Sequence, residues 1–169
     1  MQILKMAAAC ALAVTIMAAP GTMKAQGSDT VLKPAEMQKL VPATVYYRGQ
    51  QAPTELRNSG GVKFADGFFV LATPVDTSGY STGVQAKYQD YFITEVPLNI
   101  GGKILAPGIY GVGFIGDKFL VTDVGAHDLL MVPTYDDNAM IHPKPLQVVA
   151  NPAGGYRLYA GRKYVNFSR

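Results

Sequence analysis

The hydrophobic and polar positions of the chain form short runs that Gly and Pro interrupt, a pattern typical of strands and turns. Aromatic and β-branched residues dominate the runs 44–48, 68–73 and 109–115, and these residue types favour strands. Gly116 and Asp117 separate 109–115 from the next such run, 118–123. A Gly-containing pair between two apolar runs predicts a β-hairpin.

Further short runs of the same kind follow one another at the spacing of an all-β fold. The additional predicted strands are 54–57, 62–64, 91–96, 129–132, 146–150, 156–160 and 163–167. About ten short strands with brief connections predict an antiparallel β-sandwich, with a closed barrel as the alternative.

Helical patterning is confined to two short segments. Residues 33–40 predict a short N-terminal helix, because Pro34 suits the first turn and good helix formers follow it. Residues 84–90 predict one or two helical turns. We therefore divide the chain into a signal peptide (1–25), a fraying tail plus the short helix (26–42), and a β-sandwich domain (43–169).

The first 25 residues have the order of a secretory signal peptide. A short start with Lys5 precedes a continuous apolar run, 6–19, which Pro20 and Gly21 then break. Such a run is too short to span a bilayer, and we expect no transmembrane segment. Cleavage is expected after Ala25 or, as the alternative, after Ala19. Export to the periplasm or the cell exterior follows.

The cysteine content and the net charge limit how the chain can be stabilised and which kinds of partner it can bind. The only cysteine, Cys10, lies within the predicted leader, so the mature chain has neither disulfides nor thiolate ligands and depends on its core. The chain carries a net charge of +3, but outside the leader 13 basic residues face 12 acidic ones. A nucleic-acid partner is excluded by the lack of a basic field, and acidic partners are not indicated.

Two segments match at an offset of 41 residues, 58–69 and 99–110. They share an Asn, a Gly-Gly pair, an Ala and a further Gly. The pattern predicts a reused turn–strand–turn device in which Gly-Gly turns the chain with positive φ. A duplication of half-domains is the alternative.

The second copy contains Leu105-Ala106-Pro107-Gly108-Ile109-Tyr110. This sequence resembles a hairpin of transthyretin-like and carboxypeptidase-regulatory-like modules, and of uncharacterised secreted bacterial β-sandwich families. The resemblance covers residues 100–114 and includes no catalytic residue. It implies an envelope sandwich module that binds or scaffolds.

Both histidines and two methionines fall within residues 123–142, namely His127, Met131, Met140 and His142. Imidazole and thioether ligands together suit copper, so these four residues are the candidate metal ligands. The alternative is that the methionines fill gaps in the core and the histidines lie in turns.

Tyrosines and arginines supply the candidate ligand-binding residues, Tyr46, Tyr47, Arg48, Arg57 and Tyr80. A tyrosine offers a flat apolar face and a hydrogen-bonding tip, which suits a sugar or a peptide. The alternative is that most of these tyrosines belong to strands and core.

The favoured function is a secreted or periplasmic, non-catalytic module that binds a ligand or an envelope partner, whether protein, peptide or glycan. No cofactor is expected in this case. The alternatives are a periplasmic copper-binding protein and a small secreted hydrolase, although no Ser of the chain lies in a G-x-S-x-G turn.

Overall fold

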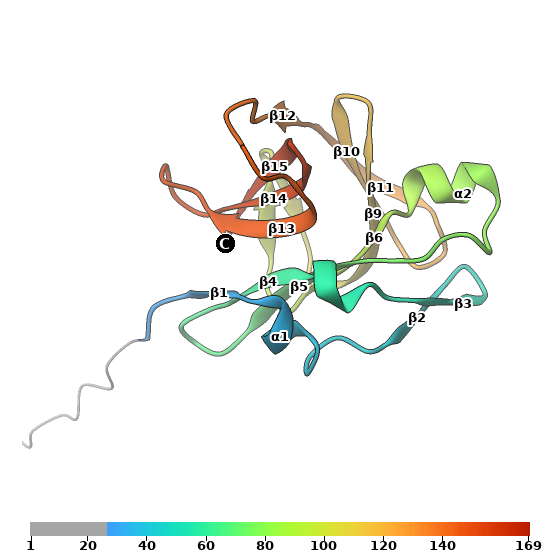
Figure 1. Ribbon diagram of the computed structural model, residues 1–169, viewed down its shortest axis with the longest axis horizontal. Coiled ribbons are helices and arrows are strands. Elements are labelled where there is room, and N and C mark those ends of the chain that lie inside the picture. Colours follow the sequence, from blue (N-terminus) through green and yellow to red (C-terminus); the bar gives the residue numbers. More distant parts are fainter. Residues whose placement is uncertain (1–26) are drawn as a thin grey trace, which may run out of the picture.

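The computed structural model describes residues 27–169, which fold into two antiparallel sheets packed face to face (Figure 1). The first sheet has seven strands, in the order β1 (Thr30–Leu32), β4 (Gly60–Lys63), β5 (Phe69–Pro74), β6 (Asp90–Thr94), β9 (Gly108–Ile115), β10 (Lys118–Thr122) and β11 (Asp128–Pro133). The signal peptide predicted over 1–25 lies outside the described residues.

The second sheet has six strands. Its order is β13 (Lys144–Ala150), β14 (Tyr156–Gly161), β15 (Lys163–Ser168), β7 (Leu98–Ile100) and β8 (Lys103–Leu105), and β12 (Tyr135–Asp136) also pairs with β15. Both sheets keep free edges, so the all-β antiparallel sandwich is confirmed and the barrel alternative is not.

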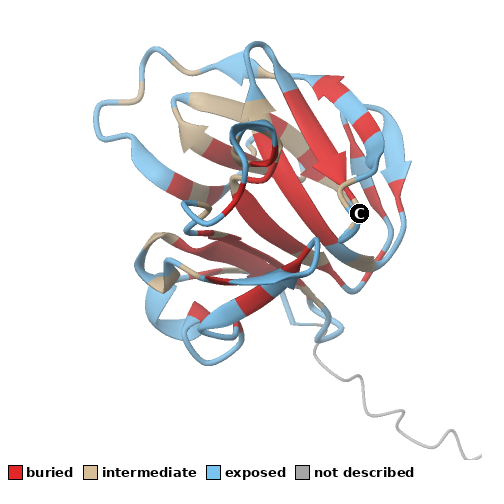
Figure 2. Ribbon diagram, turned by 90° about the vertical axis from the view of Figure 1, so that its right-hand side faces the viewer, coloured by how far each residue is buried: buried red, intermediate tan, exposed pale blue. Residues whose placement is uncertain are grey.

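The core forms where the inner faces of the two sheets meet. Buried and less buried residues alternate along β7, β11 and β13, whereas β5, β6, β9 and β10 bury consecutive residues, shown in red in Figure 2. Phe92 and Phe119 of the first sheet belong to the same buried cluster as Leu98, Leu146 and Leu158 of the second. Burial of such side chains contributes about 1.5–3 kcal/mol each, so this cluster holds the sandwich together without disulfides.

A smaller hairpin and two short helices complete the fold. The hairpin consists of β2 (Thr44–Tyr47) and β3 (Gln50–Pro53), and helix α2 (Thr82–Lys87) packs over β9. Helix α1 (Pro34–Met37) and a 3-10 turn, η1 (Leu56–Asn58), lie beside the first sheet. Both predicted helical segments are therefore present, and α1 is shorter than expected.

Two local expectations were wrong. The predicted tail contains β1, because Thr30–Leu32 pair in register with Gly61–Lys63 of β4. The predicted strand 54–57 is instead the irregular end of the hairpin, which runs into η1. Strand β1 depends on pairing with β4, which is distant in sequence, and the end of the hairpin depends on the turn of η1. Neither dependence can be recognised from a few consecutive residues.

The two matching segments differ in structure. Gly101 and Gly102 turn the chain between β7 and β8 with φ of +55° and +86°. Gly60 and Gly61 instead lie within strand β4. A Cβ on Gly61 would meet the carbonyl oxygen of Val70 on the neighbouring strand. The glycine pair is therefore needed for a tight turn in the second segment and for close packing of strands in the first.

Candidate functional site: a cationic groove between two edge strands

A groove lies where the edge strands of the two sheets approach each other. Strand β1 is the edge of the first sheet and β13 the edge of the second; both are seen on the left of Figure 1. The groove has a volume of about 520 Å³. The lining residues are Val31, Leu32, Lys33, Pro34, Arg57, Asn58, Ser59, Gly60, Lys144, Leu146, Gln147 and Val148.

Two local features shape the groove, an irregularity in the pairing of β13 and a glycine in the floor. The pairing of β13 with β14 shifts register between Lys144 and Gln147, and an irregularity of this kind bends an edge strand. Gly60 forms part of the floor, and a Cβ there would lie only 2.9 Å from the backbone nitrogen of Val148. A larger residue at position 60 would push β13 away.

The charged residues that line the groove are all positive. Its lining contains three basic residues, Lys33, Arg57 and Lys144, and no acidic one. Within residues 27–169, none of the ion pairs shorter than 4 Å involves these three side chains; the pairs are Lys87–Asp128, His127–Asp123, Lys163–Asp136 and Arg169–Asp66. All three basic residues are exposed, so their charges are available to a ligand.

The two carboxylates next to the groove in sequence already accept hydrogen bonds. Glu36 accepts one of 2.8 Å from the backbone amide of Lys33, at the start of α1. Glu55 accepts one of 3.1 Å from the side-chain amide of Asn58. Both contacts leave the cationic heads of Lys33 and Arg57 without a carboxylate partner among the described residues.

The five candidate ligand-binding residues do not form one site, and Arg48 lies in the turn between β2 and β3 with φ of +46°. Arg57 lines the groove. Tyr46 and Tyr47 point to opposite faces of β2, with Tyr46 60% exposed and Tyr47 fully buried. Tyr80 is also buried, and its hydroxyl donates to the backbone carbonyls of Tyr47 and Gln50.

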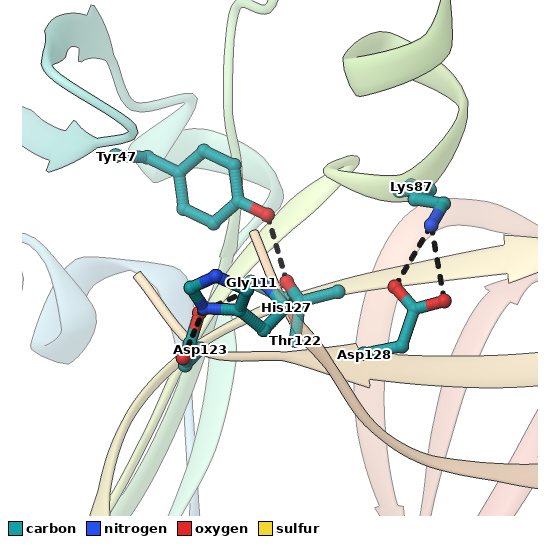
Figure 3. A network of polar contacts seen from close by, with 7 residues as sticks. All are labelled: Tyr47, Lys87, Gly111, Thr122, Asp123, His127 and Asp128. Carbon is teal, nitrogen blue, oxygen red and sulfur yellow. Dashed lines mark hydrogen bonds and ion pairs between the residues drawn. The ribbon is translucent and has the colours of Figure 1, made fainter. Parts of the chain in front are cut away.

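Tyr47 is the centre of an aromatic cluster under the β2–β3 hairpin. Its ring stacks on that of Tyr88 with centroids 3.7 Å apart, and its hydroxyl forms a 2.8 Å hydrogen bond with that of Thr122 (Figure 3). Gly111 makes room for both rings, because a Cβ there would lie within 2.8 Å of each. Burial raises the pKa of Tyr47 and of Tyr88 above the usual range of a phenol, so this cluster is neutral core.

The four candidate metal ligands lie on different parts of the fold. His127 ends the turn that leads into β11, and Met131 is the fourth residue of that strand. The imidazole of His127 lies against Asp123, and no contact joins it to Met131 among the described residues. Met140 and His142 lie in the connection from β12 to β13, where Met140 accepts a hydrogen bond from Gln147. The copper site stays a prediction that this placement does not favour.

His127 is instead part of a local turn. Asp123 accepts hydrogen bonds from the backbone amides of Gly125 and His127, and its carboxylate lies 2.9 Å from the imidazole of His127 (Figure 3). These contacts hold the pKa of Asp123 below its usual value. In the part of the chain that the structure describes, no three His, Cys, Asp or Glu side chains are grouped to hold a metal ion.

No protein-family model, curated protein or solved structure matches the chain. The resemblance of residues 100–114 to transthyretin-like modules therefore stays a prediction. None of the helices in residues 27–169 is long and apolar enough to cross a membrane.

Sequence reasoning identified one groove cation, Arg57, and missed Lys33 and Lys144. The overall charge balance gave no sign of an anionic partner, because the basic residues of the groove are compensated by acidic residues elsewhere. The three groove cations come from segments 24 and 87 residues apart in sequence. These segments meet at one groove because β1 and η1 both approach β13.

Proposed function

We propose that the chain is an exported, non-catalytic β-sandwich module that binds an organic anion in the groove between β1 and β13. The observation that carries the proposal is a lining with three cations and no carboxylate. Like charges gathered around one depression raise the local concentration of an oppositely charged ligand. An arginine among them adds a planar group suited to a carboxylate or a phosphate.

The remainder of the lining favours an anion with an apolar body. Val31, Leu32, Pro34, Leu146 and Val148 contribute hydrocarbon to the groove. Small-molecule sites typically combine mostly apolar walls with a few well-placed polar groups, in volumes of about 300–1,000 Å³. The side-chain amides of Asn58 and Gln147 add hydrogen-bonding groups that can fix the orientation of the ligand.

The test uses a fluorescent organic anion and a matched pair of competitors. Anilinonaphthalene sulfonate, which has an apolar body and one negative charge, is titrated into the mature protein. Octanoate and octanol then compete for the dye, since these competitors share an alkyl chain and differ in charge. We expect saturable binding, and displacement by octanoate at a concentration about tenfold lower than by octanol.

The variants Arg57→Gln and Lys144→Gln are each expected to weaken binding by about fivefold to tenfold at low ionic strength, with a smaller difference at high salt. Arg162→Gln is the matched control, because Arg162 is exposed in the β14–β15 turn and does not line the groove. Equal displacement by octanoate and octanol, or equal losses in Arg57→Gln and Arg162→Gln, would contradict the proposal.

Export is the second part of the proposal and rests on the leader-like order of residues 1–25. Its test is the intact mass of the full chain after expression in a Gram-negative host, followed by fractionation of the cells. We expect an extracytoplasmic product that begins after Ala25 or after Ala19. A full-length product confined to the cytoplasm would contradict export and would leave the groove experiment unaffected.

A further inference from the structure

A second surface lies on the outer face of the six-stranded sheet, and it is independent of the groove. Strand β15 buries Val165 and Phe167 and turns Tyr164, Asn166 and Ser168 outward. Residues directly opposite one another on neighbouring strands share a face of the sheet. Tyr135 and the buried Tyr159 flank Tyr164, Arg157 flanks Asn166, and Asn99 flanks Ser168. We name this row the outer strip; it follows β15, which lies below β12 in the upper part of Figure 1.

One end of the outer strip is aromatic. The rings of Tyr135 and Tyr164 lie 5.5 Å apart and 31° from parallel. Tyr135 is 51% exposed, so part of its surface remains available to a ligand. A tyrosine ring offers an apolar face together with a polar tip. This end therefore suits a ligand that has an apolar face and polar edges.

The middle of the outer strip holds an arginine that is fixed in place with unused donors. The guanidinium of Arg157 lies 4.6 Å from the centre of the Tyr164 ring, and one of its amino groups donates to the hydroxyl of Tyr159 at 3.3 Å. That hydroxyl in turn donates to Asp137 at 3.0 Å. The buried Nε of Arg157 has no hydrogen-bond partner among the described residues. That Nε is closed to solvent, but Arg157 as a whole is half-buried, so the amino groups of its guanidinium remain as donors for a ligand.

The other end of the outer strip is a small polar hollow of about 170 Å³. It is lined by Asn99, Gly101, Gly102, Gly154, Asn166, Phe167 and Ser168. Space is open where a Cβ of Gly102 or Gly154 would be, so these glycines leave the hollow accessible. Asn99 uses its side-chain oxygen to accept from the amide of Gly102. This hydrogen bond fixes the side chain of Asn99, whose amide nitrogen remains free to donate to a ligand.

From these three features we infer that the outer strip binds a neutral saccharide chain. Pyranose rings have an apolar face that stacks on an aromatic ring, and hydroxyl edges that pair with arginine and amide groups. The charges favour a neutral ligand, because Arg157 is balanced by Asp137, and Lys163 pairs with Asp136 at 3.2 Å. A peptide strand is disfavoured, since β14, β15 and β7 already pair their backbones with one another. The spacing from Tyr164 to Ser168, about 13 Å along the strand, fits a short oligosaccharide segment.

Affinity electrophoresis of the mature protein tests this inference. The native gels contain hydroxyethylcellulose, xylan, galactomannan or laminarin, with polygalacturonate as the charged comparison. We expect retardation by at least one neutral polysaccharide and none specific to polygalacturonate. Tyr135→Ala should lower the affinity about tenfold or more, while Tyr135→Trp should retain it, because either aromatic ring can stack.

Tyr46→Ala is the matched control, since Tyr46 is an equally exposed tyrosine on the β2–β3 hairpin. It should bind as the wild type does, and so should Arg57→Gln, which separates the outer strip from the groove. Arg157→Met should also lose binding, provided that its thermal unfolding remains cooperative. Absence of retardation in all four neutral gels, retardation by polygalacturonate alone, or undiminished binding by Tyr135→Ala would overturn the inference.

Discussion

The hydroxyl of Tyr110 donates a 2.9 Å hydrogen bond to the backbone carbonyl of Ala106, four residues earlier in the chain. The tyrosine ring thereby closes the turn that leads from β8 into β9. It lies over Gly108, where a Cβ would come within 2.8 Å of the hydroxyl oxygen. The contact gives a physical reason for the Pro-Gly-x-Tyr order, in which the small residue leaves room for the ring.

Loss of this contact should destabilise the protein in two graded steps. Tyr110→Phe should lower the free energy of unfolding by about 1 kcal/mol, because one net hydrogen bond is removed. Gly108→Ala should cost about 1–3 kcal/mol, because the ring must move. Urea denaturation followed by circular dichroism measures both changes.

The control for the second step is Gly83→Ala. Gly83 lies in α2 with open space around the position of its missing Cβ, so alanine there should stabilise by about 0.5–1 kcal/mol. If Gly108→Ala behaved like Gly83→Ala, the ring of Tyr110 would not be pressed against position 108.

The carboxyl group of Asp90 should make stability depend on pH. Asp90 is 5% exposed at the start of β6, and burial, with a smaller contribution from the charge of Glu55, raises its pKa to about 7. The unfolded chain releases this proton near its usual value of about 3.9. The stabilising contribution is therefore complete below about pH 4 and is lost as the pH rises through about 7, by about 4 kcal/mol at most.

Asp90→Asn should remove this loss, because an amide cannot ionise. We expect a higher melting temperature than the wild type at about pH 8 and a smaller difference near pH 4, as measured by thermal unfolding across pH. Asp76→Asn is the comparison, since a hydrogen bond from the amide of Ser78 holds the pKa of Asp76 below its usual value. A variant at position 90 that is less stable than the wild type at about pH 8 would refute the assignment.

The fold class was readable from the sequence because strands and turns carry local signals. The hairpin at Gly116-Asp117 forms as predicted, with Lys118 opposite Ile115. Strand β1 escaped prediction because Thr30–Leu32 depend on β4 for pairing. A three-residue segment such as this one becomes a strand only when an edge is available beside it.

Site prediction failed where a function requires residues from distant segments. Tyr47 and Tyr80 were candidates because of their type, yet burial converts both into core. Lys144 had no local signal, because a lone lysine at the start of a strand is usually a solvated side chain. The cation groove and the outer strip both depend on strand order, which periodicity alone does not give.

Adjacent tyrosines on β2 should respond to mutation in opposite ways. Tyr47→Ala should cost about 3–5 kcal/mol, the range for a large buried aromatic side chain, because it removes the stack on Tyr88 and the bond to Thr122. Tyr46→Ala should stay within about 0.5 kcal/mol of the wild type, as is usual for an exposed position. Chemical denaturation of the pair checks the alternation of β2, and equal losses would show that Tyr46 is also packed.

The groove cations should be dispensable for folding. Because Lys33, Arg57 and Lys144 form no ion pair with any carboxylate in residues 27–169, the double variant Arg57→Gln/Lys144→Gln should stay within about 0.5 kcal/mol of the wild-type free energy of unfolding. If removal of the two charges raises the free energy of unfolding, the increase should appear at low ionic strength, where repulsion between like charges is least screened, and should shrink as salt is added. Denaturation at low and high ionic strength measures this. A large loss of stability would mean that the cations support the fold, and weakened dye binding by the same variant would then not report on a ligand contact.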